Sequence, residues 1–178
     1  VMEAIASYIP YGGAILIIIM LLNITHQGHL FHWMDPNLTD PNSPEFDVIL
    51  FEKKRFLNIP FYAIRTIIYV VGASFFVWKL KSLSKKVDEN KGNRKIYASL
   101  YSWNVGYIAF FGFASAAWAW DWLMSIDPHW YSTLYIWYSM VSCLSTSIAV
   151  MIIISVYLKK KGVYPQFNNN HLHDLGKF

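Results

Sequence analysis

The chain has 178 residues, of which 55% are hydrophobic, 18% are aromatic and only 15% are charged, with a net charge of +4. An average soluble domain has about 25% charged residues, so this composition argues against an ordinary soluble globule. Lys and Arg lie between apolar stretches and form no stripe with aromatic residues, which argues against nucleic acid as a partner.

Four long apolar stretches follow one another along the chain. We predict membrane spans at residues 4–24, 60–80, 97–120 and 128–157. A helix of about 20 residues crosses the roughly 30 Å hydrocarbon core and satisfies its own backbone hydrogen bonds. The predicted fold class is therefore all-α: an integral membrane four-helix bundle in a single transmembrane domain over residues 1–178.

The fourth span has the clearest signals at its ends. Asp127 is expected to cap its N-terminus, with Pro128 at the first helical position and His129 at the second. Residues 159–161 are all lysines and Gly162 follows them, which suits the end of a helix.

Basic residues predict how the spans are oriented. The segment "KLKSLSKKVDENKGNRK" around the loop 81–96 holds seven Lys or Arg, and the loop 158–178 opens with lysines. The loop 25–59 has three basic residues against five acids. Because cytoplasmic loops are rich in Lys and Arg, we place both ends of the chain and the loops 81–96 and 158–178 in the cytoplasm. The loop 25–59 and the linker after the third span, which has no Lys or Arg, are placed outside. The apolar segment "FDVILFEKKRF" in that outer loop is expected to form a short helix that lies on the membrane surface, and the loop as a whole is expected to pack on other residues.

Asp121 is the most unusual polar residue, because it lies about one turn inside the outer end of a span and between Trp118, Trp120 and Trp122. An acid in such a place is a functional hypothesis by default. Two interpretations are open. Desolvation would let Asp121 carry a proton, whereas a pair with Arg65, which lies on the same outer side, would be a structural clamp that opposes proton carriage.

The other proton-transfer candidates lie at the two ends of the spans. His129 is the outer candidate, and a satisfied interfacial histidine is the alternative role. Glu3, His171, His173 and Asp174 are the inner candidates, with ordinary solvated polar residues as the alternative.

The sequence predicts no catalytic, cofactor-binding or metal-ligating residue in this segment. Cys143 is the single cysteine, which rules out an internal disulfide, a CxxC site and an iron–sulfur cluster held by this segment alone. The spans contain no interior histidine to hold a haem b, and His26, His29 and His32 are spaced so that three ligands to one metal are not expected.

The stretches "WDWLMSIDPHWYSTLY", "NNNHLHDLGKF" and "RFLNIPFYAIR" resemble the ActF membrane subunit of bacterial alternative complex III, of the NrfD/PsrC-like family. ActF-like proteins are about twice as long and have about ten transmembrane helices. We therefore expect the chain to be an internal portion of a larger NrfD-like polytopic protein in the bacterial inner membrane.

The resemblance implies a subunit of a quinol:cytochrome c oxidoreductase in a respiratory chain. It implies haem c and iron–sulfur clusters on partner subunits, namely an iron–sulfur subunit, an ActC-like subunit and c-type cytochromes, with lipid around the chain. A quinol site and proton conduction both stay open, and no residue here matches a quinone site. The competing hypotheses are a secondary transporter or channel subunit and a purely structural membrane anchor.

Overall fold

The computed structural model describes residues 2–90, 92–163 and 168–177, and every regular element in those ranges is helical. Residue 91 of the predicted loop 81–96, and residues 164–167 and 178 of the predicted loop 158–178, lie outside the described residues. The elements are α1 (Met2–Ala6), α2 (Ile9–Ile24), η1 (His32–Met34), η2 (Pro36–Thr39), α3 (Val48–Lys53), α4 (Ile59–Glu89), α5 (Arg94–Trp118), η3 (Ala119–Leu123), η4 (Met124–Ile126), α6 (Tyr135–Lys160) and α7 (Asn169–Gly176).

Three segments of the described chain are long and apolar enough to cross a membrane: Met2–Ile24, Ile59–Glu89 and Tyr135–Lys160. They correspond to the first, second and fourth predicted spans. The third, α5, is a helix of 25 residues but is not among them. Ser102, Asn104 and Ser115 lower its hydropathy, and each bonds its hydroxyl or amide to a backbone carbonyl of its own helix. The described chain is thus helical, with three segments that could cross a membrane by length and composition, where the sequence predicts four spans.

Helix α4 extends well beyond the predicted span 60–80. It has 31 residues and continues to Glu89, so most of the predicted loop 81–96 is helical. Between Leu80 and Gly92 the sequence has no Gly or Pro that would end the helix, and the φ of 91° at Gly92 suits the turn into α5. At about 1.5 Å per residue the helix is longer than the roughly 30 Å thickness of a hydrocarbon core, so a membrane-spanning α4 would extend its Lys-rich last turns beyond that core.

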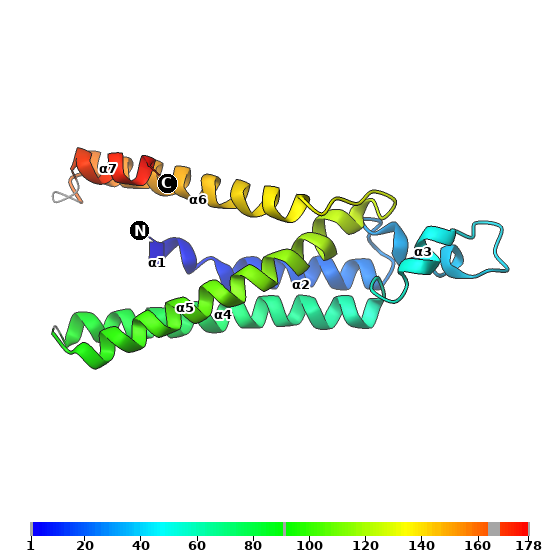
Figure 1. The fold of residues 1–178 in the computed structure, drawn as a ribbon, viewed down its shortest axis with the longest axis horizontal. Coiled ribbons are helices and arrows are strands. Elements are labelled where there is room, and N and C mark those ends of the chain that lie inside the picture. The colour runs from blue at the N-terminus through cyan, green and yellow to red at the C-terminus, as the bar shows by residue number, and fades with distance from the viewer. Residues whose placement is uncertain (1, 91, 164–167, 178) are drawn as a thin grey trace.

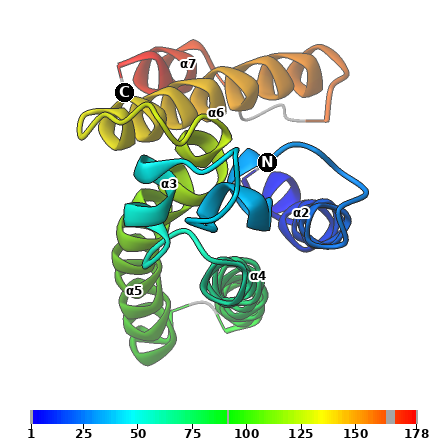
Figure 2. The ribbon, with the colours of Figure 1, turned by 90° about the vertical axis from the view of Figure 1, so that its right-hand side faces the viewer.

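Helices α2, α4 and α5 pack together, with α4 between the other two (Figures 1 and 2). Two glycines allow the close approach. A Cβ added to Gly13 would lie 2.5 Å from Cγ1 of Val70, and one added to Gly72 would lie 2.5 Å from Cζ of Phe110. Gly13 thus lies where α2 approaches α4 closely, and Gly72 lies where α4 approaches α5.

Helix α6 is set apart from these three helices, and α7 folds back along it (Figure 1).

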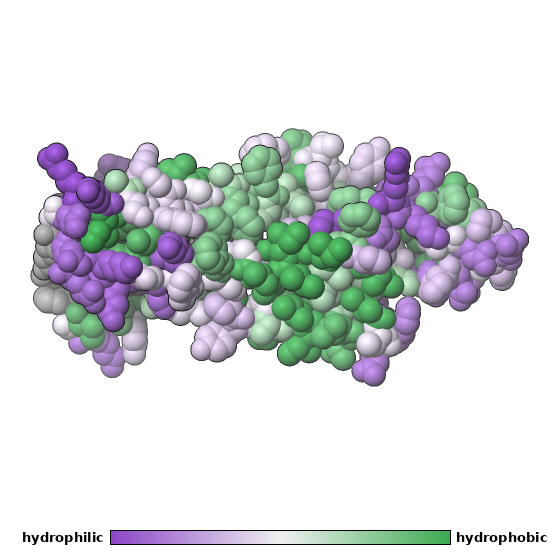
Figure 3. All heavy atoms as spheres, turned by 90° about the horizontal axis from the view of Figure 1, so that it is seen from below, coloured by the Kyte–Doolittle hydropathy of each residue, from purple (hydrophilic) through white to green (hydrophobic). Residues whose placement is uncertain are grey.

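The connections between the long helices alternate between the two ends of the bundle. The start of α1, the turn from α4 to α5 and α7 lie at one end, and α3 with the rest of loop 25–58 lies at the other. This up-and-down order agrees with the predicted sidedness of the loops, and the assignment of one end to the cytoplasm stays a prediction. Figure 3 shows hydrophilic residues gathered at both ends of one face and apolar residues between them.

The loop 25–58 packs as predicted. Its residues Phe31, Trp33, Leu38 and Leu50 are buried together with residues of α2, α4 and η3. The segment "FDVILFEKKRF" contains the expected short helix, α3, whose N-terminus is capped by the carboxylate of Asp47. The bundle therefore has a folded aromatic cap at this end, which we call the outer cap: loop 25–58 with residues 119–134.

The predicted start of the fourth span is wrong. Helix α6 begins at Tyr135, not at Pro128, and His129 lies in the preceding loop. Asp127 still accepts the backbone N–H of His129, at 3.2 Å, but it closes a turn and does not cap a helix. The carbonyl of Pro128, which a helix would pair with a later N–H, instead accepts a hydrogen bond from Lys53 Nζ at 2.5 Å.

Candidate functional site: a buried ion pair beside an aromatic cavity

Asp121 and Arg65 form a bidentate ion pair at the inner edge of the outer cap. Arg65 Nε donates to Oδ2 of Asp121 at 2.7 Å, and Arg65 Nη2 donates to Oδ1, also at 2.7 Å. The Asp121 side chain has no exposed surface, and that of Arg65 is 18% exposed. Two parallel charge-assisted bonds in one plane are the strongest geometry available to this pair.

The pair is held from three sides. Tyr69, one turn after Arg65 on α4, donates its hydroxyl to Asp121 Oδ2 at 2.9 Å. The backbone carbonyl of Phe56 accepts a second bond from Arg65 Nη2 at 3.0 Å, and the Phe56 ring lies 4.1 Å from the guanidinium carbon. Both charges are thus neutralised and hydrogen-bonded, which a buried ion pair needs in order to persist.

The local helix geometry brings Asp121 into this position. Residues Ala119–Leu123 form a π-helical turn, which is wider than an α-helical turn and is often found at functional sites. Asp121 and Trp122 are both buried there, while Trp120 is 40% exposed. Trp122 Nε1 donates to Thr66 Oγ1 at 3.2 Å, so α4 and η3 are joined by neighbouring polar contacts from Arg65, Thr66 and Tyr69.

Aromatic rings pack around the same turn. The rings of Phe31, Trp33, Tyr62 and Trp122 lie 5.3–6.1 Å apart between centroids, mostly in tilted or edge-to-face arrangements. Such pairs are favourable beyond the area that they bury. The cluster fixes loop 25–58 against α4 and η3, the two elements that carry the ion pair.

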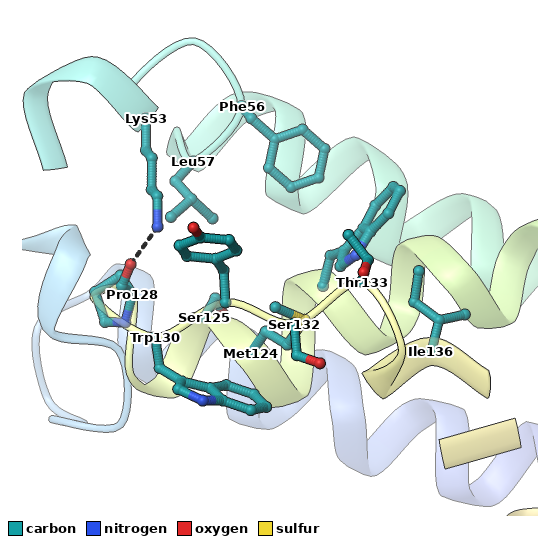
Figure 4. A pocket seen from close by; sticks show the side chains of 12 residues that line it. Lys53, Phe56, Leu57, Met124, Ser125, Pro128, Trp130, Ser132, Thr133 and Ile136 are labelled. Atoms are coloured by element: carbon teal, nitrogen blue, oxygen red, sulfur yellow. Dashed lines mark hydrogen bonds between the residues drawn. The ribbon is translucent and has the colours of Figure 1, made fainter. Parts of the chain in front are cut away.

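A cavity of about 410 Å³ lies next to Phe56 (Figure 4). The Phe56 ring, which covers the Arg65 guanidinium, is one of its walls and makes an edge-to-face contact with Trp120 at 6.1 Å. The cavity is lined by Lys53, Phe56, Leu57, Trp120, Met124, Ser125, Pro128, Trp130, Tyr131, Ser132, Thr133 and Ile136. A mostly apolar cavity with a few polar groups is typical of a small-molecule site.

His129 lies close to this cavity and joins the two halves of the outer cap. Its Nε2 is 2.5 Å from Oδ2 of Asp47, at the start of α3. Burial alone would raise the pKa of Asp47, but backbone N–H groups of Leu50 and Ile49 and the His129 ring outweigh it and hold that pKa below its ordinary value. His129 is therefore a link between α3 and the 127–134 loop, while its predicted role in proton transfer is untested.

The remaining candidates lie at the opposite end. Glu3 is in α1, and His171, His173 and Asp174 are in α7. His173 Nδ1 is 3.6 Å from Asp174 Oδ1, and Lys177 Nζ is 3.8 Å from the same carboxylate oxygen. The structure thus brings Arg65 and Asp121 together and leaves the inner candidates at the other end of the bundle (Figure 1). Within residues 2–90, 92–163 and 168–177, no group of three His, Cys, Asp or Glu side chains could hold a metal ion.

Several residues of the site were not predicted from the sequence. Tyr69 could have been found, because its spacing of four from Arg65 puts both on one face of a helix. Lys53 and Phe56 have no such sequence signal, because only the folding of loop 25–58 brings them to the site.

A scan against models of protein families and a search of curated proteins both found no match to this chain.

Proposed function

We propose that the chain is a membrane-embedded scaffold subunit of a quinol-oxidising electron-transport complex. The resemblance of "WDWLMSIDPHWYSTLY", "NNNHLHDLGKF" and "RFLNIPFYAIR" to the ActF subunit supports the respiratory assignment. In this proposal the haem c and iron–sulfur clusters belong to partner subunits, and this chain holds those partners at the membrane.

One observation carries the scaffold role: small hydroxyl residues are exposed in the middle of a membrane helix. Ser142, Thr146 and Ser147 of α6 are exposed in the described structure, and they line a hollow of about 450 Å³ beside Ile5 of α1. Small and hydroxyl residues are enriched where membrane helices pack closely, because backbones can approach and hydroxyls can bond across the contact. We therefore infer that further helices of the same assembly pack on this face of α6.

The same proposal treats Asp121 as a clamp in place of a proton carrier. Its carboxylate accepts two hydrogen bonds from Arg65 and one from Tyr69, and these bonds tie η3 to α4. The scaffold therefore does not need Asp121 to change its charge, and any proton path would use other residues.

The test of the complex is purification through a tag on this chain, from its native membrane and in mild detergent. Haem c absorbance and an iron–sulfur resonance signal should travel with the tagged chain in a constant ratio. A homo-oligomer without cofactors that moves a solute in liposomes would replace the proposal with the transporter or channel. An isolated chain with neither property would leave only a structural anchor.

A pair of matched variants tests the scaffold face itself. Thr146→Leu adds bulk in the hollow and should lower the amount of haem c that is recovered per tagged chain. Ser145→Leu makes a similar change at the neighbouring residue, which does not line the hollow, and should leave that ratio near the wild-type value. Equal recovery from both variants would remove α6 from the interface.

The clamp role has its own test. Asp121→Asn should leave the proton uptake per quinol oxidised unchanged, while the amount of folded complex falls. A lower proton yield from complex that is fully assembled would restore Asp121 as a proton carrier.

A final experiment tests the proposed orientation in the bacterial inner membrane. Protease added outside intact spheroplasts should leave the segment "KKVDENKGNRK" uncut, because we place it in the cytoplasm. Cleavage there would invert the sidedness of every candidate residue.

A further inference from the structure

We propose that the cavity of the outer cap binds one anionic phospholipid, with the phosphate on Lys53 and an acyl chain against the apolar wall. The inference depends on the chain lying in a membrane and is independent of the respiratory role. It concerns the cavity shown in Figure 4.

The first argument is position. Lys53 is the last residue of α3, in the loop region outside the membrane helices, whereas Ile136 is in the first turn of α6, a candidate membrane span. Both line the same cavity of about 410 Å³. The cavity therefore runs from the polar end of the bundle to the level at which the hydrocarbon begins, as a phospholipid does.

The second argument is charge. Lys53 is the only charged residue among those that line the cavity. No acid of the described residues lies within 4.0 Å of Lys53 Nζ, which donates to the carbonyl of Pro128 and lies 5.9 Å from the centre of the Tyr131 ring. An ammonium has three N–H donors, so the group retains donors and an unneutralised charge for an anion.

The third argument is the chemistry of the wall. The side chains of Leu57, Met124 and Ile136 and the rings of Phe56, Trp120 and Trp130 offer an apolar surface suited to hydrocarbon. Tyr131, Ser132 and Thr133 place hydroxyl groups in the same lining, where an ester or glycerol oxygen could accept a bond. Trp and Tyr are also the residues that gather where lipid meets water.

Together these features favour an amphiphile with a negative head over a neutral one. A neutral amphiphile would use the apolar wall equally well but would leave the Lys53 charge unpaired in a half-enclosed site. A phosphate near the ammonium removes that cost, and each basic residue near lipid phosphate favours anionic lipid by about fivefold.

The experiment measures which lipids the protein retains. The protein, with any partners that purify with it, is stripped of lipid in mild detergent and mixed with equal amounts of phosphatidylglycerol and phosphatidylcholine of the same acyl chains. Native mass spectrometry then counts the bound molecules. Wild type should retain phosphatidylglycerol in preference, at one molecule per chain.

Four variants make the test specific. Lys53→Gln should reduce the preference about fivefold, whereas Lys53→Arg should keep it. Lys54→Gln removes a charge from the next residue, which does not line the cavity, and should have no effect. Thr133→Trp fills the cavity from a loop and should reduce retention of both lipids.

Three results would overturn the proposal: equal retention of the two lipids, equal effects of Lys53→Gln and Lys54→Gln, or preferred retention of a neutral quinone added in competition. If Lys53→Gln fails to fold, Lys53→Arg and Thr133→Trp still decide the outcome. Because the readout is bound lipid, the result is independent of whether haem and iron–sulfur clusters purify with the chain.

Discussion

The outer cap and the opposite end of the bundle differ in how deeply their ion pairs are buried. In the outer cap, the carboxylate of Asp121 has no exposed surface and is held by Arg65 among packed aromatic rings. At the opposite end, Lys85 and Glu89 form an ion pair at 4.0 Å with side chains that are 80% and 58% exposed. A charge is costly to bury, so its partner matters in the first case and hardly at all in the second.

The largest expected difference between the two ends comes from breaking each ion pair. Asp121→Leu leaves the Arg65 guanidinium without its carboxylate, and we expect a loss of about 3–5 kcal/mol in the free energy of unfolding. Glu89→Leu should cost less than about 0.5 kcal/mol, because the pair is exposed. Unfolding by titration with a denaturing detergent, followed by circular dichroism, measures both.

The double variant Arg65→Leu/Asp121→Leu separates an unpaired charge from lost packing. It removes both charges and should recover most of the stability lost in Asp121→Leu. If the double variant were as unstable as the single one, the loss would come from packing around the clamp and not from charge.

The next expected effect compares two tryptophans. Trp122, at 6% exposure, donates a hydrogen bond to Thr66 in the outer cap, whereas Trp78, on the same helix as Thr66 but toward the other end, is 64% exposed. Trp122→Phe leaves the Thr66 hydroxyl without its donor and a void in the core, and should cost roughly 2 kcal/mol. Trp78→Phe should change the same free energy by less than about 0.5 kcal/mol, and similar losses from both would contradict the contrast between the ends.

A smaller effect on stability is expected in the middle of the bundle, where α2 and α4 approach each other closely. Gly13→Ala places a Cβ 2.5 Å from Val70 Cγ1, so either the Val70 side chain or the two helices must shift, at a cost of about 1 kcal/mol or more. Gly112→Ala, with no atom within 4 Å of the new Cβ, should instead stabilise α5 by about 0.5 kcal/mol. Thermal unfolding of the two variants should therefore shift in opposite directions, and a shift in the same direction would exclude close packing at Gly13.

The smallest expected effect is the pH dependence of the link between α3 and His129. The folded pKa of Asp47 is below its ordinary value. Asp47 therefore contributes stability at pH values above about 4, the ordinary pKa of Asp, and this contribution is lost as the pH falls through the lower folded pKa. The difference in unfolding free energy between wild type and Asp47→Asn should shrink over that range.

His129→Gln tests the source of that pH dependence. It should remove the part that comes from the ring and leave the part that comes from the backbone N–H groups of Ile49 and Leu50. Identical pH profiles for wild type and Asp47→Asn would show that the carboxylate takes no part in the link.

Much of the helix content was predictable because apolar length is a local property of the sequence. The predicted span 4–24 covers most of α1 and all of α2, and the predicted span 60–80 lies within α4. The burial of the apolar loop 25–58 was expected from its composition. The errors lie at boundaries. The Lys-rich residues beyond Leu80 remain helical in α4. Helix α6 starts seven residues after Pro128, because tertiary contacts of Lys53 and His129 hold the intervening loop.

The sequence by itself determined that this chain has long apolar helices, where their charged connections lie, and that Asp121 is out of place among tryptophans. The sequence suggested Arg65 as the partner of Asp121 but could not decide between an ion pair and proton carriage, because both hypotheses start from the same buried acid. Only the tertiary structure decided the pair, since bidentate contact depends on how a π-helical turn and α4 face each other across 56 residues of chain. The cavity beside it has the same origin, because Lys53, Phe56 and Ile136 share no sequence pattern and are brought together only by packing.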